Sequence, residues 1–217
     1  MTYDGAGSVY AVGMRVTRLG PNGSFATGPN AMHVSDALVK IGFHLDYETP
    51  DAITRKNGAG KVCLYFQPSS SVKGLVLDSL EICSEDPELE AMLGGGTVYL
   101  NGDGDTVGYQ APLVGEDPQP YGVAVEAFSA AILDGGYAPE LPYMQWVFPR
   151  LFTRQGSREL AESALGPVFE GTGNQNANFG DGPANDFEYD TGAVYQWQRC
   201  AAVPAPTGGW VAVPAVV

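Results

Sequence analysis

The chain has 217 residues, is 44% hydrophobic and carries a formal net charge of −14. This length allows one large domain or two small ones, and the apolar content is sufficient for a hydrophobic core. The acidic balance argues against nucleic-acid binding, because a protein that holds phosphates needs a basic surface.

The first third of the chain alternates between short strands and polar segments. Residues 1–11 are small and polar, and we expect an N-terminal arm there. Apolar residues that recur with a period of two predict strands at residues 12–17, 39–46, 61–67 and 72–83. A polar loop is expected over 48–60. In the strand that follows it, Val62, Leu64 and Phe66 are expected to face inward.

One helix is predicted, starting after Asp86. Asp86 can cap it, Pro87 suits the first helical position, and Gly94 is placed to end it. Leu89 and Met92 belong to an apolar stripe at helical spacing. Because two turns are too short to be stable alone, we expect the helix to pack on a sheet.

The second half of the chain again reads as strands separated by loops. Strands are expected at residues 97–100, 121–133, 143–153, 168–171 and 193–200, with a Gly/Asp turn at 101–105, a Pro-rich loop to 120 and a loop over 172–192. Trp146, Phe148 and Phe152 should share one face of their strand. Pro149 opposes that face and makes the strand an edge strand or a bulged one. Residues 158–166 could begin as a helical turn.

These elements predict an all-β fold with one short helix. Residues 1–200 are expected to form a single domain, a sandwich or barrel of antiparallel sheets with an N-terminal arm over 1–11. Residues 201–217 are rich in Ala, Val and Pro and are expected to form a C-terminal arm. Within it, Trp210 would gain from contact with an open sheet edge of a neighbouring copy. The alternative is a disordered tail.

The sequence offers little for catalysis. His33 and His44 are the only histidines, and no nucleophile, base or metal-binding set is recognisable. Cys63, Cys83 and Cys200 lack close spacing, so we expect buried, reduced thiols. We therefore predict a non-enzyme with no catalytic, cofactor-binding or metal-binding residues. Without a secretory signal or an apolar run of ~20 residues, we expect a protein made in a cytoplasm, with no membrane association.

Two Gly-rich segments need separate interpretation. Residues 57–61 (NGAGK) lack the first Gly of a phosphate-binding loop and the Ser or Thr after its Lys, so a turn is expected. Residues 101–105 (NGDGD) alternate oxygen-bearing side chains as calcium loops do. However, Thr106 and Pro112 replace the Gly and Glu that such a loop requires. A hairpin turn is the preferred interpretation, and a weak cation site is the alternative.

The negative charge is concentrated in the middle third of the chain. No Lys or Arg occurs between Lys73 and Arg150, and this stretch holds thirteen carboxylates. The first 73 residues sum to +2 and the last 68 to −3. Such a one-signed region repels polyanions. It fits a protein that lies beside DNA without holding it or that meets a basic partner, although acidity can also serve solubility alone.

Seven segments, taken together and in this order, resemble the major tail proteins, or tail tube proteins, of long-tailed bacteriophages, most closely those infecting actinobacteria. These segments are residues 36–43, 54–63, 86–90, 121–126, 141–150, 168–171 and 179–183. Their number and order across about residues 9–200 carry the resemblance.

The resemblance implies a sandwich or barrel of orthogonal sheets flanked by a helix. It further implies that copies join in rings, usually hexameric, that stack into a tube through which DNA passes without specific binding. Other implied partners are the tape measure, tail terminator and tail tip proteins, in a virion tail assembled in the host cytoplasm. The stacking loop maps to 46–60, and the arms that reach neighbouring rings map to 1–11 and 201–217.

Under this hypothesis, particular charged residues gain roles. Carboxylates of the middle third are expected to face the lumen, and the candidates are Asp78, Glu81, Asp103, Asp105 and Glu126. The candidates for ring stacking are Arg55, Lys56 and Lys61, which would meet acids of the next ring. The alternative function is a virion decoration or carbohydrate-binding module with Tyr143 and Trp146 as an aromatic platform. A hydrolase would need a carboxylate pair that the sequence does not single out.

Overall fold

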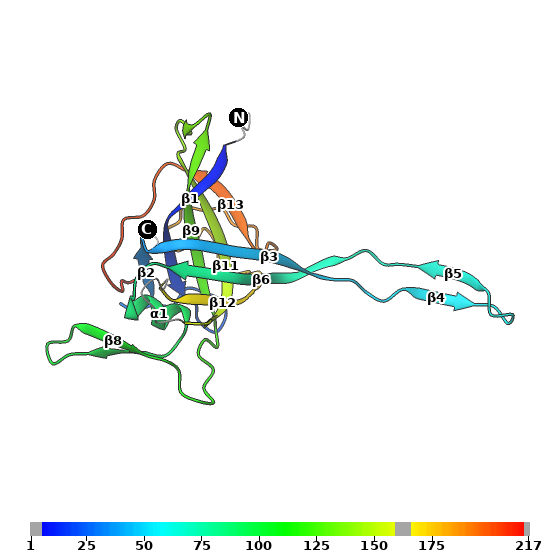
Figure 1. Cartoon of the computed structure of the whole chain (residues 1–217), viewed down its shortest axis with the longest axis horizontal. Helices are drawn as coiled ribbons and strands as arrows, with labels where there is room; N and C mark the ends of the chain where they lie inside the picture. The colour runs from blue at the N-terminus through cyan, green and yellow to red at the C-terminus, as the bar shows by residue number, and fades with distance from the viewer. Residues whose placement is uncertain (1–5, 159–165, 215–217) are drawn as a thin grey trace.

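The computed structural model describes residues 6–158 and 166–214, in which thirteen strands and one short helix are found (Figure 1). The first elements are β1 (Gly7–Arg18), β2 (Met32–Ser35), β3 (Leu38–Glu48), β4 (Ile53–Lys56), β5 (Val62–Phe66), β6 (Ser71–Ile82) and α1 (Pro87–Leu93). They are followed by β7 (Thr97–Leu100), β8 (Thr106–Gln110), β9 (Val123–Leu133), β10 (Gly136–Tyr137), β11 (Tyr143–Gln155), β12 (Val168–Gly173) and β13 (Gln196–Cys200). The helical turn expected at 158–166 falls on residues 159–165, which lie outside the described residues.

One antiparallel sheet organises the molecule. Its strand order is β2-β1-β9-β11-β12-β6-β3, with β10 paired to β9 and β13 paired to β11. The sheet curls so that β3 and β6 cross over β1 and β9, which gives two layers (Figure 1). This sandwich-like, nearly all-β architecture confirms the predicted fold class. We refer to this sheet together with α1 as the body.

The core of the body lies between the two layers. Its fully buried residues include Met14, Val16, Leu77, Leu80, Phe148 and Phe169, drawn from β1, β6, β11 and β12. The helix adds Leu89, Met92 and Leu93 to the same cluster. Because burying one such side chain contributes about 1.5–3 kcal/mol, this cluster accounts for much of the stability of the body. It also explains how a helix of two turns is held in place.

The ends of α1 match the prediction. The Asp86 side chain accepts hydrogen bonds from the backbone N–H groups of Glu88 and Leu89, both at 3.1 Å. His33 Nε2 lies 2.9 Å from the same carboxylate. Burial alone would raise the pKa of Asp86, but these hydrogen bonds lower it below its usual value. At the other end the Gly94 N–H donates to the Glu90 carbonyl, at 2.7 Å.

Of the two alternatives predicted for the strand that holds Pro149, an edge strand or a bulged one, β11 is the bulged strand. It lies between β9 and β12 in the sheet, and Pro149 is accommodated by a bulge in which the pairing with β9 passes from Phe148 to Leu151. The bulge resets the alternation of side chains, so Leu151 joins Phe148 in the core. The expectation that Phe152 shares that face is therefore wrong; its ring lies under the Arg150 guanidinium instead.

The N-terminal boundary also needs correction. Strand β1 starts at Gly7, and Gly7 to Ala11 pair with the end of β9. The Ser8 and Ser129 hydroxyls lie 2.6 Å apart across this pairing. The arm predicted over 1–11 is therefore wrong for 7–11, while residues 1–5 lie outside the described residues. Backbone pairing joins residues 7–11 to the sheet. Because their side chains are mostly exposed, the sequence shows no alternation of apolar and polar residues there.

Candidate assembly surfaces

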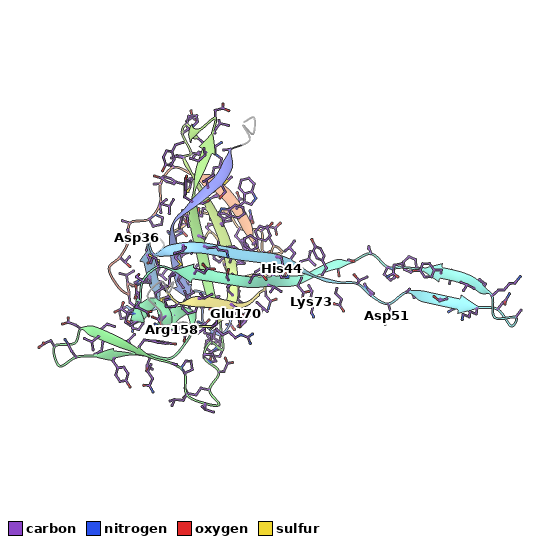
Figure 2. All side chains as sticks on the ribbon, in the orientation of Figure 1. Asp36, His44, Asp51, Lys73, Arg158 and Glu170 are labelled. Atoms are coloured by element: carbon purple, nitrogen blue, oxygen red, sulfur yellow. The ribbon has the colours of Figure 1, made fainter. Side chains whose placement is uncertain are left out.

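A long hairpin leaves the body at one end of the molecule (Figure 1). Strands β3 and β6 remain paired as far as Glu48 and Ser71, and β4 and β5 then pair with each other. Figure 2 shows His44 and Lys73 where the hairpin leaves the body, with Asp51 part-way along it. We call residues 48–71 the long hairpin. About ten residues in each arm, at ~3.3 Å per residue, give it a reach of roughly 30 Å.

The side chains of the long hairpin correct an earlier expectation. Val62, Leu64 and Phe66 were predicted to face a core, but every residue of β4 and β5 is exposed. The large exposed apolar side chains are Ile53, Val62, Leu64, Tyr65 and Phe66, each with 48–64% of its surface open to solvent. The alternating pattern reflects a true strand, yet the strand projects beyond the body and has nothing to pack against. Isolated two-stranded hairpins are marginally stable in water, and exposed apolar patches mark contact surfaces.

The three ring-stacking candidates lie together at the far end of the long hairpin. Arg55 and Lys56 end β4, and Lys61 closes the turn of residues 57–61. In this turn the Asn57 N–H donates to the Lys61 carbonyl at 2.8 Å, and Asn57 Oδ1 accepts from the N–H groups of Ala59 and Lys61 at 3.0 Å. No carboxylate occurs between residues 52 and 73, so the tip is basic.

A shorter hairpin, formed by β7 and β8, projects from the opposite side of the body (Figure 1). We call residues 97–110 the short hairpin. Asp103 and Asp105, two of the lumen candidates, are exposed in its turn, and Tyr99, Leu100 and Val107 are 55–61% exposed along its strands. No Lys or Arg occurs in it. Strand β8 was not predicted, since this stretch was assigned to the Pro-rich loop.

In the turn of the short hairpin, Asn101 Oδ1 is an oxygen that a cation site would need, but it already accepts hydrogen bonds from the backbone. Asn101 Oδ1 accepts from the N–H groups of Asp103 and Asp105, at 3.0 and 2.8 Å. The Asn101 Nδ2 donates to the Asp105 carboxylate at 3.2 Å. Over residues 6–158 and 166–214, no group of three or more His, Cys, Asp or Glu is arranged to hold a metal ion. The segment is a hairpin turn, as the preferred interpretation had it.

The lumen candidates Asp78 and Glu81 lie on β6, on the face turned away from the core. Asp78 Oδ2 is 3.0 Å from His44 Nδ1, and Glu81 Oε1 is 3.2 Å from Lys40 Nζ. Both therefore have a cationic or polar neighbour on β3. Both belong to β6 in the body, whereas Asp103 and Asp105 belong to the turn of the short hairpin.

Glu126 contradicts its assignment to the lumen. It is 1% exposed and forms an ion pair with Arg15, whose Nη2 lies 2.6 Å from Glu126 Oε1 and 2.8 Å from Asp186 Oδ1. Gln145 donates a further hydrogen bond to Glu126, at 2.8 Å. Burial alone would lower the pKa of Arg15, but Glu126 and Asp186 hold it above its usual value, so Arg15 stays charged. Glu126 is a structural residue of the sheet.

The C-terminal segment lies along its own body rather than extending freely. The Trp210 N–H and Nε1 donate to the Glu88 carboxylate at 2.6 Å and to the Glu88 carbonyl at 3.1 Å. Arg18 stacks over the Trp210 ring, 5.1 Å from its centroid. Val211 forms a bridge with Met32 at the edge of β2. Trp210 was expected to contact a sheet edge of a neighbouring copy, whereas the described residues place it against its own chain, whose edge strand β2 accepts the segment.

Sequence reasoning missed two further features. The cysteines were expected to be buried, but Cys63 and Cys83 are exposed and Cys200 is partly buried; all three are free. It also missed Glu90, which is 2% exposed on α1 and lies 3.0 Å from Arg158. Burial, and then the charge of Asp86, raises the pKa of Glu90 to about 7. A carboxylate directly followed by Ala-Met-Leu in a short helix was the available signal.

The comparisons with known proteins leave this chain without an assigned family. No protein-family model matches it, and no curated protein is significantly similar to it. Among the described residues, the one helix falls far short of the length and hydropathy needed to cross a membrane. The features that indicate a function are therefore the two hairpins and the distribution of charge.

Proposed function

We propose that this chain is a structural subunit that self-assembles into hexameric rings, and that these rings stack into the tail tube of a long-tailed bacteriophage. The observation that carries the proposal is the long hairpin, which reaches roughly 30 Å from the body with its apolar side chains exposed. A lone chain gains nothing from such an element. An assembly gains a contact with the next subunit.

Energetics support this interpretation of the hairpin. Five large apolar side chains are about half exposed there, and covering the exposed half of each is worth about 0.7–1.5 kcal/mol, half the value for full burial of such a side chain. Both edges of the β4–β5 pair are also open to further strand pairing. Soluble monomers avoid long, apolar, unpaired edges, whereas a self-assembling subunit uses them. The proposed contact therefore stabilises the hairpin and the assembly together.

The charge distribution supports DNA passage as the role of the tube. DNA slides through a channel only if the wall does not trap its phosphates, and an acidic wall satisfies this condition. Asp78 and Glu81 stay candidates for the lumen, together with Asp103 and Asp105. Glu126 is withdrawn because Arg15 neutralises it in the core. The tube would be assembled in the host cytoplasm with tape measure, terminator and tip proteins, would need no cofactor, and would remain in the virion tail.

The alternative, a virion decoration or carbohydrate-binding module, has weaker support. Its aromatic platform would use Tyr143 and Trp146, but Trp146 packs edge-on against Phe43 and donates its Nε1–H to Ser129 at 3.1 Å. Tyr143 meets Tyr137 at an interplanar angle of 63°. Rings held in this way do not form the flat, open platform that stacks on a sugar.

Sedimentation velocity on the purified chain tests the proposal against the alternative. We expect the mass distribution to move from monomer to a discrete closed ring and then to larger stacks as the protein concentration rises. A single monomer peak at every concentration, combined with binding to a glycan array, would contradict the tube and favour the binding module.

A further inference from the structure

The two hairpins share one turn geometry. In each, an Asn Oδ1 accepts two backbone N–H groups, from Ala59 and Lys61 in the long hairpin and from Asp103 and Asp105 in the short one. In each, the fourth residue of the turn is a Gly at positive φ, +77° at Gly60 and +91° at Gly104. A left-handed backbone conformation at this position favours Gly. The turns are therefore interchangeable in backbone and differ in side-chain charge.

The tips of the two hairpins carry charges of opposite sign. The long hairpin has Arg55, Lys56 and Lys61 at its tip and no carboxylate nearby, whereas the short hairpin has Asp103 and Asp105 at its tip and no Lys or Arg. Both two-stranded sheets also expose large apolar side chains, which include Leu64 on one and Leu100 on the other. Each hairpin thus presents an apolar, unpartnered sheet with charge of one sign at its end.

The hairpins cannot satisfy each other within one chain. They project from opposite ends of the molecule, with the whole body between them (Figure 1). A second copy of this chain can bring its basic, apolar hairpin to the acidic hairpin of the first. This arrangement requires no other protein. Charge complementarity selects this arrangement over contact between two like hairpins, since like tips repel.

We infer that the short hairpin is the docking surface for the long hairpin of another copy. This inference rests on the self-assembly proposed above and names the partner surface. It places Asp103 and Asp105 at the contact between copies, so that Asp78 and Glu81 remain as the lumen candidates. The contact is heterologous, because one surface of each copy meets a different surface of the next. Such a contact propagates from copy to copy until it closes or forms an open filament. It therefore leaves hairpins of one type unpaired at each end of any open assembly.

Two charge-reversed variants test the pairing. One is Arg55→Glu/Lys56→Glu/Lys61→Glu, in which both hairpins are acidic, and the other is Asp103→Lys/Asp105→Lys, in which both are basic. We expect each variant alone to need about tenfold to hundredfold more protein for half-assembly than the unaltered chain. We expect an equimolar mixture to recover the assembly of the unaltered chain within about threefold, because every junction again joins opposite charges. Sedimentation velocity measures all three samples.

Controls separate the pairing from folding and from charge in general. All five substituted side chains are exposed, so thermal unfolding should stay within a few degrees of the unaltered chain. Lys61→Glu is compared with Lys73→Glu, which reverses the same charge at the base of the hairpin and should have little effect.

The outcomes distinguish this inference from the proposed function. Ring stacks that are unaffected by either reversal, or variants that fold but do not recover on mixing, would overturn the inference and leave the function standing. Open chains that recover on mixing but never close into rings would support the pairing and overturn the tube. If the unaltered chain stays monomeric up to about 1 mM, its affinity for itself is weaker than that of specific assemblies. That result would overturn both the pairing of the hairpins and the proposed function.

Discussion

The long and short hairpins use the same turn but are held differently by the body. Thr106 of the short hairpin donates a hydrogen bond to the Glu88 carboxylate at 2.8 Å, and Tyr109 is partly buried against α1, which raises the pKa of its hydroxyl. Beyond the contact between Thr49 and Ser70 at 2.6 Å, the long hairpin continues as two exposed strands. One hairpin is thus anchored and the other is free.

This difference suggests a division of roles. An anchored surface is presented in a fixed orientation, so it suits a receptor, whereas a free hairpin can adjust as it docks. The backbone of each turn is set by Asn and Gly. The intervening positions can therefore vary in charge without altering the fold, and charge can determine which surface meets which.

Removing the free hairpin is expected to have the largest effect. Replacing residues 50–69 by an Asn-Gly turn, which suits a two-residue hairpin, should abolish all species larger than the monomer. Because no core residue lies in this segment, the melting temperature should change by only a few degrees. Size-exclusion chromatography with light scattering measures the first effect, and circular dichroism the second. Oligomers that persist after this deletion would show that assembly uses another surface.

Breaking the buried ion pair between Arg15 and Glu126 is the contrasting change, because it should affect the body and leave both hairpins intact. Arg15→Met leaves Glu126 buried without its cation, and the free energy of unfolding should fall by about 3–5 kcal/mol. The double variant Arg15→Met/Glu126→Leu should recover most of this loss, while Asp186 remains solvated at 41% exposure. Urea denaturation measures both variants. Equal losses in the single and double variants would mean that packing around Arg15 matters and its charge does not.

The pH dependence tests how firmly α1 supports the short hairpin. The pKa of Glu90 is raised from an ordinary value near 4.5 to about 7, so the folded state holds the proton more tightly than the unfolded chain. The resulting stability is complete below about pH 4.5 and is lost as the pH rises to about 7. Arg158, at 3.0 Å, favours the charged form, so we expect a loss of about 1–2 kcal/mol.

The matching variant is Glu90→Gln, which does not titrate. Its free energy of unfolding should be nearly flat between pH 5 and pH 8, where the unaltered chain declines. An identical decline in both proteins would assign the pH dependence to another group. Hydrogen exchange in β7 and β8 should follow the same trend, and exchange in β4 and β5 should not.

The smallest effects are expected at the two turns. Asn57→Ala and Asn101→Ala each remove two side-chain hydrogen bonds to the backbone, worth about 1 kcal/mol apiece. Neither should shift the melting temperature by more than a few degrees, because both turns lie outside the core and the loss is largely confined to the hairpin tips. Each should weaken assembly by a few fold, as the charged side chains lose their fixed positions. A larger effect of Asn101→Ala on the fold would show that the short hairpin contributes to the body.

The strands and the helix were predictable because their signals are local. The alternation in β3 and the cap at Asp86 depend on neighbours in sequence. The cap was predicted correctly, and in β3 Ile41 and Phe43 pack on the core as expected, although Val39 is exposed. Whether the apolar face of an alternating strand meets a core or solvent depends on what lies opposite the strand. The sequence does not show this, so Leu64 was predicted to face a core although it is exposed. The turn of 57–61 gave no sign that β4 and β5 extend beyond the sheet.

Charged residues were harder to place for a similar reason. Asp103 and Asp105 stand in a polar turn and were correctly expected to be accessible, whereas Glu126 lies within an apolar strand. Its flanking valine, alanine and phenylalanine were a signal of burial that was outweighed by the charge of the whole segment. Its partner Arg15 lies 111 residues away in sequence, and Asp186, which Arg15 also binds, lies 60 residues away, so only the fold brings them together.

Negative-stain electron microscopy of the purified chain, across protein concentration and salt, tests the central claim most directly. The account predicts rings or hollow tubes at about 0.1 M salt, and shorter tubes at about 1 M, where the screening length falls from ~10 Å to ~3 Å and the hairpin tips attract less. Monomers alone at every concentration and salt would contradict it.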